Sequence, residues 1–242
     1  MGRSFEVRKA SMMKTGLQKS KLYARFGKEI YMCAKNGGSN PESNLALKHL
    51  IERAKKQQVP ADIVKRNIDK AEGGGGEDYT TIRYEGFGPS GSSFIVDTLT
   101  DNVNRTVGEV RNCFTKIGSK LGVNGSVEHL YKHLAYLSVS GVDEETLLET
   151  LLEQDIDVID IESIDGGFEI SADGYALDRL ETAVTHIASA EVMNSESGWY
   201  AHETITLDDQ DYEKFEKFMH LINQCEDVQN VYHNVTVKEE NE

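Results

Sequence analysis

Histidine and cysteine are the side chains best suited to metal binding or nucleophilic chemistry, and the chain has seven of the first and three of the second. His129 and His133 are four residues apart, but their segment has the pattern of a strand and lacks an H-E-x-x-H arrangement. Cys33, Cys113 and Cys225 are far apart and form no C-x-x-C pair. We therefore expect no metal, no cofactor and no disulfide. Each cysteine is interpreted as a small buried apolar residue in a reducing compartment, the cytoplasm.

A glycine-rich segment at residues 86–91 could cradle a phosphate. The P-loop and the dinucleotide fingerprint both need a helix directly after the loop, so that its N-terminal amides face the phosphate. Here a strand pattern follows, and the chain contains no Gly-Lys-Ser or Gly-Lys-Thr, so we expect a structural turn. The abundant carboxylates of the C-terminal half follow polar faces and give no isolated acid–base pair. These patterns mark no general acid or base.

Lysine and arginine are concentrated at the N-terminal end, and their chemistry is the binding of phosphate. Residues 1–70 contain 16 Lys and Arg against 6 Asp and Glu, whereas residues 133–242 contain 4 against 27. The net charge of −15 and the pI near 4.9 therefore conceal a basic head on an acidic body. Such a head attracts polyanions, because each cation that meets a phosphate releases a condensed counterion. The predicted contacts in this head are Arg3, Arg8, Lys9, Lys14, Lys19, Lys21, Arg25, Lys28, Lys35, Lys55, Lys56, Lys65 and Arg66. Phe5, Tyr23 and Tyr31 could stack on bases.

Short helices are expected to position these cations behind an extended basic arm at residues 1–16. Ser20 is a candidate N-cap for the first helix, Asn40-Pro41 opens the second, and Pro60 opens the third. Their narrow apolar stripes predict a small three-helix bundle that is basic on the outside. Four glycines at residues 73–76 then form a flexible linker.

The hydrophobic period changes to two after this linker, which indicates strands. Strands are expected at residues 81–85, 92–100 and near 127–131, with a helix capped by Asn104 before the third. Residues 134–204 repeat the order β-α-β-β-α-β of the ferredoxin-like unit, with a helix capped by Asp143, a hairpin at residues 165–167 and a second helix at about 175–187.

One helix and one strand remain at the C-terminus, too few residues to bury a core alone. We expect them to return to the sheet that begins near Tyr79, so that the ferredoxin-like unit is an insertion. The predicted fold is a multidomain α+β protein. Its domains are a basic arm and helical bundle at 1–72, a discontinuous middle α+β domain at 79–132 plus 207–242, and the inserted ferredoxin-like domain at 133–206.

Several motifs resemble those of the YebC/PmpR family. They include Tyr-Glu-Gly-Phe-Gly-Pro-Ser-Gly at 84–91, Leu-Thr-Asp-Asn-Val-Asn-Arg-Thr at 99–106 and Leu-Gly-Val-Asn-Gly-Ser-Val at 121–127. In the head, Gly-Arg-Ser-Phe-Glu at 2–6 and Ala-Lys-Asn-Gly-Gly at 34–38 agree as well. The resemblance implies the same three domains and a non-enzymatic role. Arg105 and Arg111 lie in the most family-like stretch and are added to the candidate nucleic-acid contacts.

Two functions stand first at this point, and an enzyme or a pure protein-interaction module is the third alternative. Members of the family are usually labelled as DNA-binding transcriptional regulators, whereas some resemble ribosome-associated translation factors that help synthesis through proline-rich stretches. The first implies DNA as the partner of the basic head, and the second implies ribosomal or transfer RNA and possibly the ribosome. No apolar run approaches the roughly 20 residues that a membrane span needs. We expect a cytoplasmic monomer.

Overall fold

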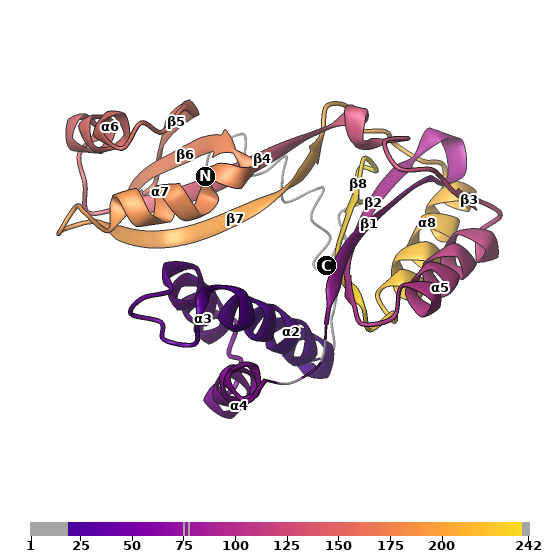
Figure 1. Ribbon diagram of the computed structural model, residues 1–242. Helices are drawn as coiled ribbons and strands as arrows, with labels where there is room; N and C mark the ends of the chain where they lie inside the picture. The colour runs from indigo at the N-terminus through magenta and orange to yellow at the C-terminus, as the bar shows by residue number, and fades with distance from the viewer. Residues whose placement is uncertain (1–18, 75, 77, 239–242) are drawn as a thin grey trace. The chain divides into compact units, whose positions relative to one another are not determined.

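The protein is described here by a computed structural model that covers residues 19–74, 76 and 78–238. These residues form seven α-helices and two four-stranded antiparallel sheets (Figure 1). Contacts divide the described chain into two compact units, one of residues 19–129 with 203–237 and the other of residues 130–202 with 238. The α+β character predicted for the chain is confirmed. The three-domain boundaries stay a prediction.

The helical head consists of α2 (Lys19–Gly37), α3 (Leu45–Lys56) and α4 (Ala61–Glu72). Apolar residues at spacings of three and four face inward from each helix. They form one core of Phe26, Ile30, Ala34, Leu47, Leu50, Ala54, Val59 and Val64.

Three predicted helix starts are wrong. Ser20 lies inside α2. Asn44, not Asn40, caps α3: its side chain accepts a hydrogen bond from the Leu47 amide at 3.1 Å and donates to the Gly38 carbonyl at 2.7 Å. Likewise Asn102, not Asn104, caps α5 by accepting from the Arg105 amide at 3.0 Å. In each pair, the asparagine whose side chain reaches free helical amides is the cap.

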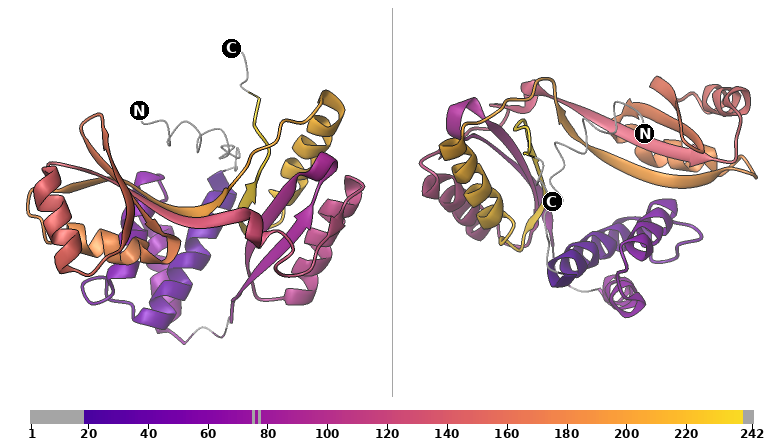
Figure 2. Two further views of the ribbon diagram at one scale, coloured as in Figure 1. Left: turned by 90° about the horizontal axis from the view of Figure 1, so that it is seen from above. Right: turned by 180° about the vertical axis from the view of Figure 1, so that it is seen from behind.

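The first sheet has the order β3-β1-β2-β8. It contains β1 (Thr80–Phe87), β2 (Ser93–Thr100), β3 (Lys120–Leu121) and β8 (Val228–His233). The helices α5 (Val103–Lys116) and α8 (Asp209–Ile222) pack on one face of it (Figure 2). The core between them includes Phe94, Phe114, Phe215 and Phe218. The C-terminal helix and strand therefore return to the sheet begun by β1, as expected, and β8 pairs with β2.

The turn predicted at residues 86–91 is present but shorter, because β1 continues to Phe87 and the 3₁₀ turn is at Pro89–Gly91. The Gly88 amide donates to the Ser92 carbonyl at 2.7 Å, and Gly91 has a φ of 79°, which a residue without Cβ adopts without strain.

The strand predicted near residues 127–131 is wrong. Residues 128–130 form a 3₁₀ turn, and β4 begins only at Tyr131. The amides of Val127 and Glu128 donate to the Glu85 carboxylate at 2.7 and 2.9 Å, and the Gly125 amide donates to it at 2.7 Å. A buried carboxylate thus binds the amides that a strand partner would otherwise take.

The second sheet has the order β5-β6-β4-β7. Its elements follow along the chain as β4 (Tyr131–Ser140), α6 (Glu144–Glu153), β5 (Val158–Ile164), β6 (Gly167–Asp173), α7 (Leu177–Val184) and β7 (Glu191–Ala201). This is the β-α-β-β-α-β order of a split βαβ unit. Asp143 caps α6 and residues 165–166 form the β5–β6 turn, as predicted, whereas α7 is shorter than expected. Both helices share one apolar core with the sheet.

Candidate nucleic-acid interface

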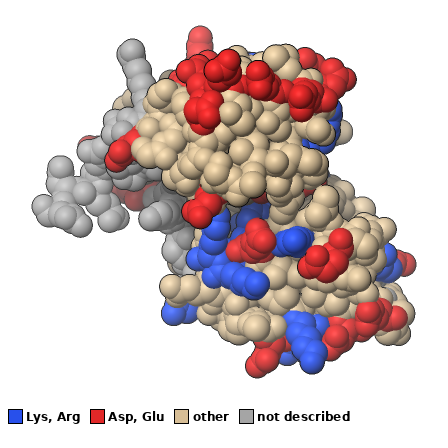
Figure 3. Space-filling model, turned by 90° about the vertical axis from the view of Figure 1, so that its left-hand side faces the viewer, with Lys and Arg blue, Asp and Glu red and all other residues tan. Residues whose placement is uncertain are grey.

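The exposed cations of the helical head lie mainly on α3 and α4. Lys55 and Lys56 end α3, and Lys65 and Arg66 lie on the outer face of α4. These positions are exposed because the opposite faces of both helices supply the apolar core. In Figure 3, Lys and Arg form blue groups on the surface, with Asp and Glu between them.

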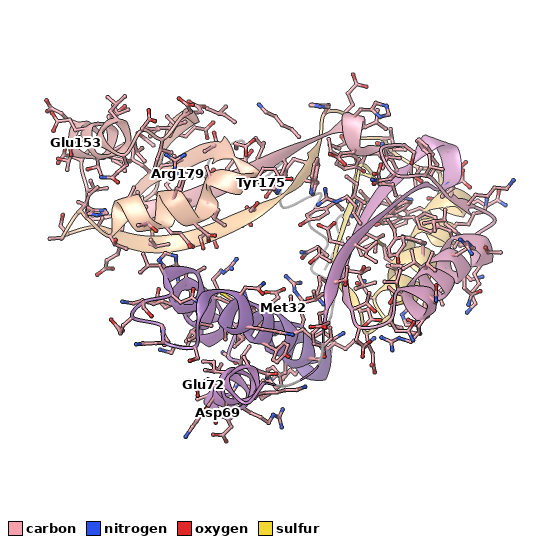
Figure 4. All side chains as sticks on the ribbon, viewed as in Figure 1. Met32, Asp69, Glu72, Glu153, Tyr175 and Arg179 are labelled. Carbon is pink, nitrogen blue, oxygen red and sulfur yellow. The ribbon has the colours of Figure 1, made fainter. Side chains whose placement is uncertain are left out.

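Acidic residues accompany these cations on α4. Asp69 and Glu72 lie on this helix (Figure 4), and the Ser39 hydroxyl donates a hydrogen bond to the Glu72 carboxylate. The surface is therefore a mixed one in which groups of cations alternate with carboxylates. Phosphate would be attracted to the cationic groups rather than to the helical head as a whole.

A cavity of about 400 Å³ lies between α2 and α4. Its walls combine aromatic rings with cations, which is the combination that binds a nucleotide through base stacking and phosphate contact. The residues that form it include Tyr23, Lys28, Tyr31, Arg66, Asn67 and Lys70.

Tyrosine rings lie close to three cations of the helical head. The ammonium groups of Lys35 and Lys70 lie 5.7 and 5.5 Å from the centre of the Tyr31 ring. The Lys28 ammonium lies 5.6 Å from the centre of the Tyr79 ring. These are cation–π distances. Tyr31 is fully buried, so it braces the cations, whereas half-buried Tyr23 keeps part of its ring accessible.

A second group of predicted contacts is held by one carboxylate. Asp227, which is 2 % exposed, accepts from Lys28 Nζ at 2.7 Å and from Arg105 Nη2 at 2.6 Å. The hydroxyls of Thr100 and Thr106 donate to it at 3.1 and 2.7 Å. Burial alone would raise the pKa of Asp227, but the hydrogen bonds from Lys28, Arg105 and Thr106 lower it to about 2. Lys28 and Arg105 thus serve the fold of this unit.

Other predicted contacts also have partners within the protein. Lys21 Nζ donates to the Asn223 carbonyl at 2.7 Å, Arg25 pairs with Glu29 at 3.1 Å, and Lys35 pairs with Asp78 at 2.6 Å. Exposed pairs of this kind contribute roughly 0–1 kcal/mol, so a phosphate can compete for Lys35.

Apart from Lys56, which is exposed at the end of α3, the remaining predicted residues divide into two sets. Within the part of the chain that the structure describes, no ion pair is made by Lys19, Lys55, Lys65, Arg66 or Arg111. Arg111 is exposed on α5, outside the helical head. The predicted contacts of the basic arm, Arg3, Arg8, Lys9 and Lys14, together with Phe5, lie outside the described residues.

Lys70 is a further cation of this surface that was not predicted from the sequence. It is exposed, follows Arg66 by four residues on α4 and shares the cavity with it. The signal that could have found it is this helical spacing, which puts both cations on one face.

The histidine and cysteine candidates also have defined surroundings in the structure. His133 lies in β4, where its ring stacks on Trp199 at 4.8 Å and meets exposed Tyr175 edge-on at 4.5 Å. Tyr175 is labelled in Figure 4. Of the three cysteines expected to be buried, only Cys113 is; Cys33 and Cys225 are half-buried. Cys113 and Cys225, distant in sequence, have their Sγ atoms 3.8 Å apart.

No helix in the described ranges is long and apolar enough to cross a bilayer.

Known proteins resemble this chain over nearly its whole length. Residues 3–74 match the family model of the TACO1/YebC protein N-terminal domain, and residues 79–235 match that of the TACO1/YebC second and third domain. A probable transcriptional regulatory protein of Vibrio campbellii is 53% identical over 235 residues, which covers 97% of this chain and 99% of that one. A protein of the same description from Pseudoalteromonas atlantica is 48% identical over 243 residues and covers both chains completely.

A solved structure shares the fold. The crystal structure of the conserved hypothetical protein Aq1575 from Aquifex aeolicus has a TM-score of 0.71 and 32% identity, and the match covers 94% of each chain. With relatives this similar and family models spanning both parts of the sequence, the chain belongs to the TACO1/YebC family.

Proposed function

We propose that the protein is a non-enzymatic regulator of gene expression that binds nucleic acid through its basic N-terminal segment, with DNA-binding transcriptional regulation as the first candidate. The observation that carries the proposal is the cationic surface of α3 and α4 beside the tyrosine-lined cavity. The names of the relatives, probable transcriptional regulatory proteins, agree with it. We further propose that it acts in the cytoplasm as a monomer.

Binding would rest on the phosphate backbone. Lys55, Lys65 and Arg66 are exposed and are positioned by helices rather than by loops. Contacts of this kind fix the position of the protein on a nucleic acid and carry no sequence information.

One feature favours DNA. The helix α4 follows α3 after residues 57–60, a connection as short as that of a helix-turn-helix motif. In such motifs the second helix enters the major groove with its N-terminal residues against the bases. The first turn of α4 contains Asp62, which can accept from cytosine but repels phosphate.

A different feature favours RNA, with the protein acting as a ribosome-associated translation factor that binds ribosomal or transfer RNA. The cavity beside Tyr23 could receive an unstacked base. Such bases occur in loops and ends of folded RNA, where aromatic side chains stack on them, and not in duplex DNA.

The test is a salt titration of the full chain on duplex DNA and on a folded RNA. The double variant Lys65→Ala/Arg66→Ala should weaken binding to all sequences about equally. It should flatten the log–log salt slope by nearly two units on duplex DNA, at about 0.9 per phosphate. The matched control is Lys217→Ala, which removes an exposed cation of α8 and should leave the slope unchanged. An unchanged slope in the double variant contradicts the proposal.

Sedimentation of cell extracts through a sucrose gradient separates the two candidates. Co-migration with ribosomes that is lost at high salt supports translation, whereas migration free of ribosomes together with tight duplex binding supports transcription.

A further inference from the structure

Two thiols that are 112 positions apart in the sequence are neighbours in the structure. Cys113 lies in α5 and Cys225 in the turn that follows α8, and both helices pack on the same sheet (Figure 1). The two Sγ atoms are 3.8 Å apart, and both residues are free cysteines. Because a disulfide has a sulfur–sulfur distance of about 2 Å, the sulfurs would need to approach by just under 2 Å.

The side of the pair that can move is Cys225. It lies beyond the end of α8 at the edge of the apolar core, and within the described residues its Sγ makes one further hydrogen bond, at 3.8 Å to the Leu221 carbonyl oxygen. Thiol hydrogen bonds are weak, so this contact offers little resistance to rotation of the side chain. Cys113, in contrast, is buried in the middle of a helix.

A cavity adjoins both cysteines. A cavity of about 590 Å³ is lined by Cys113 and Cys225 together with Asn112 and Lys116 of α5 and Gln224 of the turn. It has space for a molecule the size of a peroxide, and Lys116 contributes a positive charge beside the thiols.

We propose that Cys113 and Cys225 are an oxidative modification site, at which a hydroperoxide converts the two thiols into a reversible disulfide. The proposal is independent of nucleic-acid binding. The Cys113 thiolate attacks one peroxide oxygen, the O–O bond breaks, and the product is a sulfenic acid at Cys113 with release of water or an alcohol. The Cys225 sulfur then attacks Cys113 Sγ, the S–O bond breaks, and water leaves. The two thiols lose two electrons and two protons in total, and the hydroperoxide is reduced by two electrons.

The two thiols differ in a way that suits these roles. A hydrogen bond from Cys225 lowers the pKa of Cys113, against the opposing effect of burial, and the charge of Lys116 adds to the lowering. The same hydrogen bond and burial raise the pKa of Cys225. These directions, with Lys116 three residues further along the same helix, favour Cys113 as the attacking thiolate and Cys225 as the resolving thiol.

The bond would join α5 to the turn that holds Asp227, two residues beyond Cys225. Because Asp227 accepts from Lys28 of α2 and Arg105 of α5, oxidation would restrict the movement of the turn after α8 relative to these two helices. Cross-linking residues so far apart restricts the unfolded chain, so the oxidised protein should have a melting temperature higher by about 5 °C or more.

The test uses the full-length protein exposed to hydrogen peroxide, alkylated, digested without reduction and mapped by mass spectrometry. The expected product is a peptide pair that joins Cys113 to Cys225 and has lost two hydrogens, while Cys33 is alkylated. Dithiothreitol should restore three reactive thiols. Because the mapping needs no substitution, it decides the question even if a cysteine variant fails to fold.

Two variants sharpen the test. Cys225→Ser should leave a sulfenic acid at Cys113 that dimedone traps, and the matched control Cys33→Ser should form the same cross-link as the wild type. Recovery of three alkylated thiols after peroxide overturns the proposal. So does a bridge that involves Cys33, or oxidation of Cys113 beyond the sulfenic acid in wild type without a bridge.

Discussion

Replacing Asp227 by Asn should reveal how much one buried carboxylate stabilises the unit that contains the helical head and the first sheet. Asp227 accepts from Lys28, Arg105, Thr100 and Thr106, and its side chain is 2 % exposed. Its pKa falls from 3.8 to about 2 in the folded protein. At about 1.4 kcal/mol per pKa unit, the fold favours the charged carboxylate by about 2.5 kcal/mol. Asparagine has the shape of the carboxyl group without its charge, so Asp227→Asn should lose about this amount at pH 7.

The assay is urea unfolding followed by circular dichroism, because the single tryptophan, Trp199, belongs to the other unit. The lowered pKa means that this stability is fully present above pH 3.8 and is lost as the pH falls through about 2. The difference between variant and wild type should therefore shrink over that range. Asp101→Asn is the matched control, since Asp101 also pairs with Arg105, at 2.8 Å, but is 46% exposed. Its loss should stay below about 1 kcal/mol. Equal losses at the two positions would refute the role assigned to burial.

Two further substitutions test buried polar groups of the same unit. Burial lowers the pKa of His233 to about 4, so the unfolded chain binds a proton more tightly and wild-type stability should fall by about 3 kcal/mol between pH 6.5 and pH 4. The His233 ring contacts Phe94 and Phe215. The variant His233→Phe should therefore flatten this pH dependence in urea titrations, whereas His220→Gln, at an exposed position, should leave it unchanged. Glu85→Ala should cost at least about 2 kcal/mol and speed amide exchange at Gly125 and Val127, because the Glu85 carboxylate is 1% exposed and accepts from both amides. Exposed Glu109→Ala on α5 should change stability by less than about 0.5 kcal/mol, and a similar effect of the two Glu variants contradicts this assignment.

Local signals in the sequence predict much of the fold. The Asp143 cap and the Asp165-Gly166 turn depend on residues adjacent in the chain, and the structure has both. Caps chosen between two asparagines are different. Asn102 and Asn104 are equally suited by type, and the choice follows from Thr100, whose hydroxyl accepts from the Asn102 amide at 2.9 Å. That contact belongs to the cluster around Asp227, more than 100 residues away in sequence. Residue type alone could not identify the cap.

Less of the candidate site could be predicted from the sequence, because it too depends on contacts between residues that are far apart in the chain. The sequence predicts the positive charge of the head, and it predicts that Lys65 and Arg66 are exposed opposite an apolar stripe. The partners of Lys28 and Arg105 were not, because Asp227 lies 199 and 122 positions from them. The pairing of Cys113 with Cys225 depends in the same way on the return of α8 to the first sheet.

These intramolecular pairs change the expected strength of phosphate binding. If all 15 predicted cations met phosphates, the log–log salt slope on duplex DNA would be about −13. A phosphate that took Lys28 or Arg105 would have to replace the buried Asp227 carboxylate, which would remain without its cation. The five predicted cations that make no ion pair within the described residues, Lys19, Lys55, Lys65, Arg66 and Arg111, would give a slope of about −4.5. The four cations of the basic arm, which lie outside the described residues, could bring it to about −8. A slope in the range of −4 to −8 is therefore the quantitative expectation of the salt titration, and a steeper one would mean that phosphates also take cations that have partners within the protein, such as Lys35 or Lys28.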